Sequence, residues 1–347
     1  MTDLWEYLSR AQKPFVLYGT GDGADKILDV MEKKGIKASG VFASDGFVRK
    51  RVFRSFPVLS YKEACEMFGD MIILICFGSS LPDVMERFFS LSALHETYVP
   101  DVPVCAGELF DIDFLNKNRD KINRVRSLLA SEGSVKLYDS IIMAKLTGKI
   151  EYFTQGVEDD GGILDFMELK NVKVALDLGA YNGDTALKLF DFVPGVQKII
   201  AVEPDERNFK KLCVNTAFTP KIVPIYAAAS DKKEVLTFTK GGGRGIRRKE
   251  GGKTVSVMGV PAQSLLEGEK ADYIKIDVEG NEKQAIIGVK EEIISSLPTL
   301  RIALYHRSED IFELPLMINE LAPQYKLYIK RTMSFPMWDI DLIAKKD

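Results

Sequence analysis

The chain has 347 residues, of which 46% are hydrophobic and 28% are charged, and its formal net charge is -3 at pH 7. These values are typical of a globular protein, and the length favours two domains. With 47 basic and 50 acidic side chains, the sequence offers no overall basic field that would attract a nucleic acid. A nucleic-acid partner is therefore not expected.

The N-terminus and the cysteines indicate the cellular environment. Residues Met1 to Leu8 carry early acids and no long apolar run, so neither a secretory signal nor a membrane span is expected. The four cysteines form no Cys-x-x-Cys pair, which argues against structural zinc and a disulfide framework. They are expected to be buried free thiols: Cys65, Cys76, Cys105 and Cys213. We predict a cytoplasmic protein without a membrane partner and leave its oligomeric state open, a homo-oligomer included.

Residues 13 to 106 alternate between strand and helix patterns, which is typical of a parallel sheet with crossover helices. The sequence predicts strands at 15–18, 40–42 and 71–77 and helices at 25–34 and 83–90. A glycine-containing turn, Gly19 to Gly23, follows the first strand, and Gly78-Ser-Ser80 follows the third. We interpret residues 1–106 as a small Rossmann-like domain for a nucleotide or a sugar.

From Glu108 to about Lys149 the apolar residues follow helical spacing. One face carries Ile122, Val125, Leu128 and Leu129, and another carries Leu137, Ile141, Ile142 and Leu146. Residues 107–170 are therefore predicted to be a helical connector whose apolar faces pack on the region C-terminal to it.

The alternation of strands and helices resumes in residues 171–347. Predicted strands lie at 174–178, 198–202, 222–226, 235–239, 254–260, 273–277, 301–305, 326–330 and 340–344. Predicted helices begin near Asp184 and cover 205–214, 277 to about 294 and 311–321. The last two strands suggest a β-hairpin. The glycine-rich segment 240–252 is expected to be a mobile loop of the kind that often covers a site.

Two strand ends in this second region predict a nucleotide-type cofactor. In Asp177-Leu-Gly-Ala-Tyr-Asn-Gly183, the glycines allow the backbone to approach a ligand closely. Glu203 ends the next strand, about twenty residues later, where an acid accepts hydrogen bonds from ribose hydroxyls. Ser230 and Asp231 follow another strand and could contact an adenine ring. The alternative is a structural turn followed by a helix-capping acid.

The segment from Ala271 to Gln284 places acids where a buried strand becomes a helix. Asp277, Glu279 and Glu282 follow the strand, at the edge where ligands bind in open α/β sheets. Acids are also favoured before a helix for capping alone, which is the alternative for Asp277 and Glu279. Lys275 lies inside the strand and needs a partner such as Asp277 or Glu279.

One of only two histidines, His306, follows the strand that ends at Tyr305. A histidine or carboxylate at this edge could act as general base for a hydroxyl nucleophile. The alternative for His306 is a hydrogen bond to a helix end. The same acids with His306 and Asp310 could instead hold a divalent cation. Our first interpretation is a site without a metal. His95 is expected to be a surface or loop residue.

Four segments together resemble the FkbM family of S-adenosylmethionine-dependent methyltransferases, over roughly residues 170 to 345. They are Asp177 to Gly183, Glu203-Pro-Asp205, Ile274-Lys-Ile-Asp-Val-Glu-Gly280 and Leu304-Tyr-His-Arg-Ser-Glu-Asp310. The resemblance implies a class I methyltransferase fold of the α/β class, with a mainly parallel seven-stranded sheet and an antiparallel final strand. It also implies S-adenosylmethionine as cofactor and methyl transfer to a hydroxyl of a sugar, glycan or related natural product.

The resemblance also assigns roles by position. Gly179, Ala180 and Gly183 would face the methionine part of the cofactor, and Glu203 its ribose. The full expected cofactor-binding set is Asp177, Gly179, Ala180, Tyr181, Asn182, Gly183, Glu203, Pro204, Ser230, Asp231 and Asp277. The expected catalytic residues are His306, Asp277 and Glu279. Where the family usually has a Leu-Asp pair, this chain has Ala262-Gln263, so the role of that acid does not carry over.

Two other functions stay open from the sequence. The turn from Gly19 to Gly23 with Asp45 also matches a nucleotide fingerprint, so a nicotinamide-dependent sugar oxidoreductase is one alternative. The N-terminal segment is similar to the sugar-nucleotide-binding units found ahead of some sugar-modifying enzymes. A non-catalytic nucleotide-sugar-binding protein with a methyltransferase fold is the second alternative, and a purely structural N-terminal unit is also compatible with the pattern.

Overall fold

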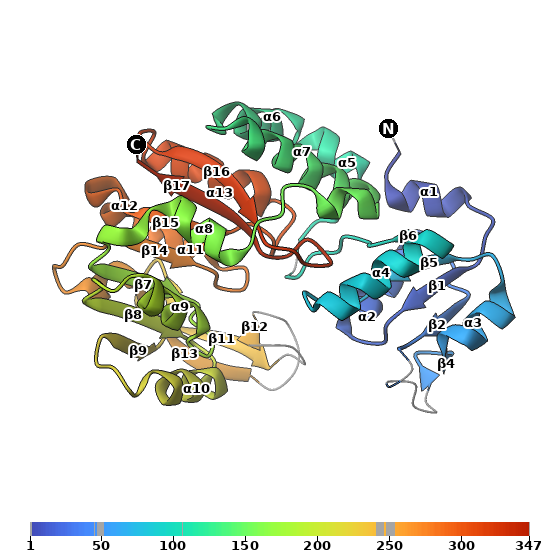
Figure 1. Cartoon of the computed structure of the whole chain (residues 1–347), viewed down its shortest axis with the longest axis horizontal. Helices are drawn as coiled ribbons and strands as arrows, with labels where there is room; N and C mark the ends of the chain where they lie inside the picture. Colours follow the sequence, from blue (N-terminus) through green and yellow to red (C-terminus); the bar gives the residue numbers. More distant parts are fainter. Residues whose placement is uncertain are drawn as a thin grey trace.

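The computed structural model describes residues 2–44, 46, 52–105, 107–240, 246–247 and 254–346. Figure 1 shows an N-terminal α/β unit and a larger C-terminal α/β unit, with a group of helices above the junction between them. Both units have mainly parallel sheets. The α/β class expected from the sequence is therefore confirmed.

The N-terminal sheet has six strands in the order β3-β4-β2-β1-β5-β6, and only the β3–β4 pair is antiparallel. Its strands are β1 (Phe15–Tyr18), β2 (Gly40–Phe42), β3 (Val52–Phe53), β4 (Phe56–Leu59), β5 (Ile72–Ile75) and β6 (Glu96–Tyr98). Its helices are α1 (Leu4–Arg10), α2 (Asp22–Lys33), α3 (Tyr61–Phe68) and α4 (Pro82–Leu94). Every residue of β1 and β5 is buried, as their unbroken apolar runs require.

A set of helices joins the two units. They are α5 (Ile112–Lys117), α6 (Arg119–Leu128), α7 (Glu132–Thr147), η2 (Ile150–Thr154), α8 (Asp160–Met167) and η3 (Leu169–Asn171). The helix α6 packs against α13 (Asp310–Leu321), and α7 packs against β16 (Lys326–Arg331). The prediction that these helices pack on the C-terminal region is therefore confirmed.

The C-terminal sheet has seven strands in the order β16-β17-β15-β14-β7-β8-β9. Its remaining strands are β7 (Val174–Leu178), β8 (Lys198–Glu203), β9 (Ile222–Tyr226), β14 (Tyr273–Ile276), β15 (Thr299–Ala303) and β17 (Ile340–Lys345). The last strand, β17, runs antiparallel to both β15 and β16, and the other neighbouring pairs are parallel. The expected seven-stranded sheet with an antiparallel final strand is confirmed, as is the closing hairpin.

Four strands form a separate small sheet, in the order β10-β13-β11-β12. They are β10 (Ala228–Ser230), β11 (Glu234–Lys240), β12 (Ile246–Arg247) and β13 (Thr254–Pro261), which leads into η4 (Ala262–Leu266). Apart from Lys240 and the two residues of β12, the segment predicted to be a mobile loop, 240–252, lies outside the described residues.

The helices of the C-terminal unit are α9 (Asp184–Phe192), α10 (Glu206–Thr216), α11 (Glu282–Ile287), α12 (Lys290–Ser296) and α13. The sequence predicts one helix where the structure has α11 and α12. The break lies at Gly288, where a Cβ would come within 2.0 Å of the Ser230 carbonyl oxygen. The chain therefore needs glycine where this helix pair approaches the small sheet.

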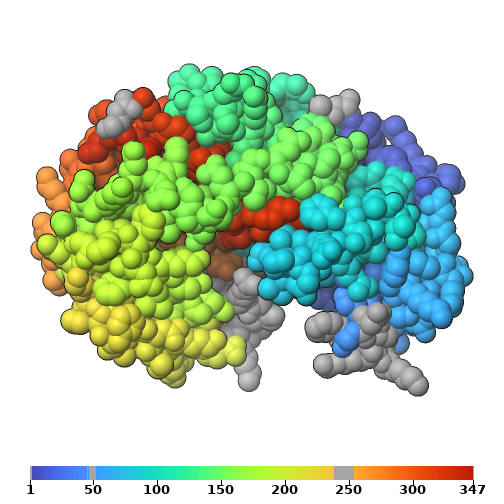
Figure 2. All heavy atoms as spheres, viewed as in Figure 1, coloured from blue at the N-terminus to red at the C-terminus, as the bar shows by residue number. Residues whose placement is uncertain are grey.

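The turn between β16 and β17 reaches across to the N-terminal unit (Figure 1). Phe335 forms a two-residue antiparallel bridge with Ser79 through backbone hydrogen bonds in both directions. Its fully buried ring stacks 5.0 Å from the ring of Phe153 and lies 5.4 and 5.6 Å from those of Phe88 and Phe89. In Figure 2 the red C-terminal segment is visible between the green and cyan parts of the surface, above a notch.

One hydrophobic core spans all three parts of the chain. It includes Val16 of the N-terminal sheet, Ile141 of the connecting helices and Leu176 of the C-terminal sheet. The division into domains at 1–106, 107–170 and 171–347 therefore stays a prediction.

We expect Phe335→Ala to lower the free energy of unfolding by about 3 kcal/mol or more, because it removes a fully buried ring from an aromatic cluster. Urea denaturation measures this loss. Leu94→Ala is the control, since Leu94 is 72% exposed and its truncation should change stability by less than about 0.5 kcal/mol. Equal effects of the two substitutions would contradict the docking described for the hairpin.

Candidate active site

A buried lysine connects the ends of two neighbouring strands. Lys275 of β14 is in register with Asp177 of β7, and its Nζ lies 3.3 Å from Asp177 Oδ1 and 3.7 Å from Asp277 Oδ2. The same Nζ donates a hydrogen bond of 2.9 Å to the carbonyl oxygen of Gly179. The predicted pairing of Lys275 with Asp277 is confirmed. The nearer partner, Asp177, was not foreseen from the sequence as a partner of the lysine.

These pairings keep the lysine charged. Burial opposes the charge of Lys275, but the two aspartates outweigh this effect and raise its pKa above the ordinary value. Asp177 is itself 3% exposed and also accepts a hydrogen bond from the Thr185 hydroxyl at the start of α9. The lysine and its partners therefore fix the glycine turn after β7 against the end of β14.

Close packing within the protein explains why two positions of this turn are glycine. A Cβ on Gly179, whose φ is +86°, would lie 1.8 Å from the carbonyl oxygen of Asp277, so only glycine allows this approach. Gly183 has φ +90° and would clash with Leu212 at 2.9 Å. The expected approach of a ligand to these glycines stays a prediction, because close packing already explains them.

Glu203 lies at the end of β8 beside the same turn. It is buried, and each of its oxygens accepts one backbone hydrogen bond of 2.8 Å, Oε2 from Tyr181 and Oε1 from Asp205. A carboxylate oxygen can accept a second bond, so this side chain can also receive two hydroxyls. Burial raises the pKa of Glu203 to about 7. The capping of α10 is performed by Asp205 instead, through the N–H groups of Arg207 and Asn208.

The remaining residues of the expected cofactor set lie close to this edge. Ala180 is buried, and its N–H donates to the Val202 carbonyl. Asn182 accepts from the N–H of Asp184, and Pro204 lies between Glu203 and the helix cap. Ser230 is buried and its hydroxyl donates to Asp231, 3.2 Å away.

The small sheet is tied to the acidic turn after β14. The side-chain amide of Asn281 donates a hydrogen bond of 2.8 Å to the carbonyl oxygen of Ala229, next to Ser230. The Ser230–Asp231 end of β10 is therefore held beside the segment that carries Asp277 and Glu279.

A cluster of acids surrounds His306, which lies three residues beyond β15 and is 1% exposed. Its Nε2 lies 3.6 Å from Asp277 Oδ1 and 3.8 Å from Glu279 Oε2. Its Nδ1 lies 2.9 Å from Oε1 of Glu282. The three residues expected to be catalytic are therefore brought together, and Glu282 joins them.

Glu282 is the member of this cluster that was missing from the expected catalytic set. It is 1% exposed, and its Oε1 accepts hydrogen bonds from the N–H groups of Val278 and Gly280. Glu282 thereby accepts hydrogen bonds from the backbone N–H groups of the turn before α11. Capping of this kind was the alternative role for Asp277 and Glu279. Its place in an acid-rich strand end was a visible signal, but its burial against His306 depends on the tertiary fold.

The acids determine the charge of the imidazole. Burial opposes its protonation, but Glu282 first, then Asp277 and Glu279, raise the pKa of His306 to about 9. Similarly, burial opposes the charge of Asp277, but Lys275 and His306 lower its pKa below the ordinary value. At neutral pH His306 is therefore an imidazolium beside ionised Asp277 and Glu282, whose pKa values are lowered.

The segment that leaves the N-terminal unit forms one wall of this site. The N–H of Cys105 donates to the His306 carbonyl at 2.9 Å, and its thiol donates to the Glu279 carbonyl at 3.1 Å. Gly280 lies so close that a Cβ would be 2.8 Å from the Cys105 sulfur. All four cysteines are free, as predicted, but only Cys76 is fully buried.

The glycines in the two predicted loops of the N-terminal unit pack closely against other parts of the protein. A Cβ on Gly19 would meet Phe77 at 2.8 Å, and one on Gly23 would meet the Cys76 carbonyl oxygen at 2.3 Å. Asp45 lies outside the described residues. The Gly78-Ser-Ser80 loop packs against the last hairpin: the Trp338 ring covers Gly78, and Ser79 pairs with Phe335.

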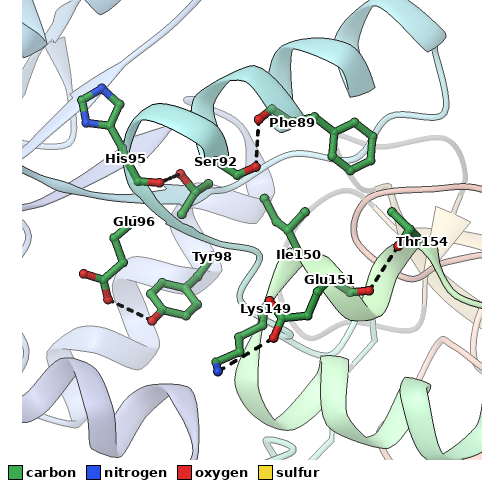
Figure 3. A pocket seen from close by; sticks show the side chains of 10 residues that line it. Phe89, Ser92, His95, Glu96, Tyr98, Lys149, Ile150, Glu151 and Thr154 are labelled. Atoms are coloured by element: carbon green, nitrogen blue, oxygen red, sulfur yellow. Dashed lines mark hydrogen bonds and ion pairs between the residues drawn. The ribbon is translucent and has the colours of Figure 1, made fainter.

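A separate cavity of about 470 Å³ lies where α4 and β6 meet η2 (Figure 3). His95, expected on the surface or in a loop, lines it and is partly buried, with its Nε2 2.8 Å from the Tyr61 hydroxyl. Tyr98 donates to Glu96 within the same cavity. The complete lining is Phe89, Ser92, His95, Glu96, Thr97, Tyr98, Lys149, Ile150, Glu151 and Thr154. It shares no residue with the His306 cluster.

We expect Lys275→Met to reduce the free energy of unfolding by about 3 kcal/mol or more, because it leaves Asp177 and Asp277 without their shared cation. Combining it with Asp177→Asn should restore part of the loss, since one of the two uncompensated charges is then removed. Urea denaturation of the single and double variants measures both effects. Strictly additive losses would contradict a direct coupling between the two residues.

Glu203 gives a prediction for pH. Its folded pKa of about 7 exceeds the ordinary value of 4.5, so the folded state retains a proton that the unfolded state has released. Protonation of Glu203 therefore adds stability that is fully present below pH 4.5 and is lost as the pH rises to about 7. We expect wild type to lose on the order of 2 kcal/mol more than Glu203→Gln over this window. Parallel stability curves, from urea denaturation at each pH, would refute this assignment.

Among the described residues, no helix is both long and apolar enough to cross a membrane. Comparison with known proteins gives a family match for most of the C-terminal unit. Residues 177–326 match the model of the methyltransferase FkbM domain. No curated protein sequence matches the chain.

Among solved structures, the chain is similar to the methyltransferase FkbM from Methylobacillus flagellatus KT, with a TM-score of 0.73 and 16% identity, over 99% of this chain and 94% of the other. The match shows that the two chains share a fold along their whole length. Precorrin-6y C5,15-methyltransferase from Geobacter metallireducens GS-15 matches at a TM-score of 0.34 and 12% identity, over 56% and 92% of the two chains. Aeropyrum pernix fibrillarin, whose structure contains natively bound S-adenosyl-L-methionine, matches at 0.35 and 16%, over 52% and 74%.

The family match includes both strand ends described above, from Asp177 on β7 to His306 after β15. The fold is the one expected of such a domain, with an antiparallel final strand in a seven-stranded sheet. The C-terminal unit of this chain therefore carries, at residues 177–326, a match to the methyltransferase FkbM domain.

Proposed function

We propose that this methyltransferase is an S-adenosylmethionine-dependent O-methyltransferase that acts on a hydroxyl of a sugar, glycan or related natural product. The observation that carries the proposal is the adjacency of two sites at one sheet edge. Lys275 connects the glycine turn after β7 directly to Asp277, and Asp277 belongs to the cluster around His306.

The turn after β7 and the end of β8 suit the methyl donor. When bound, S-adenosylmethionine supplies a methyl group from its sulfonium, and the rest of the cofactor leaves as a neutral thioether. Glu203 would accept hydrogen bonds from the ribose hydroxyls, since each of its oxygens already holds only one N–H group. Gly179 to Gly183 would hold the methionine part, and Ser230 with Asp231 the adenine.

The cluster around His306 suits the acceptor. A hydroxyl has to lose its proton as it attacks, and a positioned acid or base group usually assists. We expected His306 to be that base. Because its pKa of about 9 leaves it protonated at neutral pH, the imidazolium has no free nitrogen to take the hydroxyl proton. Asp277 and Glu279 are then the acceptors left at this edge, and His306 is suited to hold these carboxylates in place.

Hydroxyl-rich acceptors fit such a site because several carboxylate oxygens can orient neighbouring hydroxyls. Asp277 and Glu279 are 33% and 37% exposed at their side chains, whereas His306 and Glu282 are each 1% exposed. The two partly exposed carboxylates are thus the groups that an acceptor can reach, and the buried pair supports them from behind.

We expect Asp277→Asn to lower the rate of methyl transfer by about a hundredfold or more, because the amide cannot accept the hydroxyl proton. The assay uses radiolabelled S-adenosylmethionine with a panel of nucleotide sugars and glycans. Asp272→Asn is the matched control: Asp272 precedes the same strand at its opposite end, where it accepts from the N–H groups of Lys173 and Val174.

Three outcomes separate the alternatives. Loss of methyl transfer in Asp277→Asn, with full activity in Asp272→Asn, supports the proposal. Binding of S-adenosylmethionine without turnover on any acceptor would favour a non-catalytic sugar-binding protein. A larger loss in His306→Gln than in Asp277→Asn, with activity rising through a pH near 9 in wild type, would return the role of base to His306.

A further inference from the structure

We propose that Asp277, Glu282 and His306 bind a divalent transition-metal cation. These three residues each offer one ligand atom, and the three atoms lie within 4.8 Å of one another. They come from different parts of the chain, the end of β14, the start of α11 and the segment after β15. The proposal deepens the proposed function, since the cation would lie at the site assigned to the acceptor.

The separation between His306 and Asp277 fits a shared cation better than a hydrogen bond. His306 Nε2 lies 3.6 Å from Asp277 Oδ1, which is too far for a hydrogen bond. A cation about 2.1 Å from each of two donors holds them about 3 Å apart at a right angle and about 4 Å apart when they are opposite. The 3.6 Å separation between His306 Nε2 and Asp277 Oδ1 therefore lies within the range that one shared ion would impose.

One ligand oxygen is buried without any hydrogen bond. Glu282 Oε1 is held by the N–H groups of Val278 and Gly280, but its Oε2 has no hydrogen-bond partner among the described residues. Glu282 is 1% exposed, so water does not compensate this oxygen freely. Buried carboxylate oxygens of this kind are usually paired or bound to a metal.

The charges around the cluster also favour a cation. Asp277, Glu279 and Glu282 approach a single imidazole. The nearest lysine, Lys275, is shared between Asp277 and Asp177. The three carboxylates therefore give the cluster an acidic lining that a divalent ion would complement.

The ligand types select the class of metal. Carboxylates suit Mg²⁺, Ca²⁺ and Mn²⁺, whereas an imidazole nitrogen favours transition metals such as Zn²⁺, Fe²⁺ and Mn²⁺. One imidazole with two carboxylates thus fits Mn²⁺ better than Mg²⁺. An acceptor hydroxyl that contacts such an ion loses its proton more easily, and Glu279, 3.8 Å from His306 Nε2, would share with Asp277 the role of proton acceptor that the proposed function gives to both.

The test is binding of Mn²⁺ alone to the full-length, chelator-treated protein, measured by electron paramagnetic resonance. We expect one tight site in wild type with a pulsed-resonance nitrogen coupling from an imidazole. Asp277→Asn should weaken binding at least tenfold, and His306→Gln should remove the nitrogen coupling. Glu292→Gln is the matched control, since Glu292 is also buried but accepts from the Ala271 N–H and has no part in the cluster.

The outcomes are distinct from those of the methyl-transfer assay. Absence of Mn²⁺ binding below millimolar concentration, or a nitrogen coupling unchanged in His306→Gln, would overturn the cation site while leaving methyl transfer untouched. Tight binding without methyl transfer to any acceptor would keep the site and remove the proposed function. Circular dichroism checks that each variant is folded, and a folded variant of either ligand with wild-type affinity also contradicts the proposal.

Discussion

The arrangement of the site depends on a single buried ammonium group. Lys275 reaches from the interior of β14 to the carbonyl of Gly179 and lies between Asp177 and Asp277. A lysine in a sheet core is costly without such partners, so the carboxylates are needed by the fold as well as by chemistry. The same contact sets the spacing between the turn after β7 and the acids after β14, which positions two halves of a site on adjacent strands.

Much of the fold could be predicted from local patterns. The apolar strands from β7 to β9 and the final hairpin follow directly from runs of residues and turns, because a buried strand has the same apolar pattern in any context. The division of one helix into α11 and α12 could not be predicted, since Gly288 is required by the Ser230 carbonyl of another sheet. Short edge strands such as β3 and β6 were also missed, since two or three residues carry too little periodicity.

The residues that form the site could be predicted from the sequence, but the role of each residue could not. Asp277, Glu279 and His306 were identified because acids and a histidine follow neighbouring strands, and parallel strands end at one edge. The charge state of His306 was not accessible, because it results from Glu282 packed against the ring in the folded protein. Similarly, Gly179 was interpreted as ligand-facing, although the Asp277 carbonyl accounts for its lack of a side chain.

The aromatic tip of the last hairpin affects how this protein can be cut or recombined. Phe335 is enclosed by Phe88 and Phe89 of α4 and by Phe153 of η2. A truncated chain that starts near residue 171 would retain the tip but lose all three rings, and would present a bare apolar surface to water. Such a fragment would tend to self-associate, so a fusion of this unit to another scaffold would have to include α4 and η2.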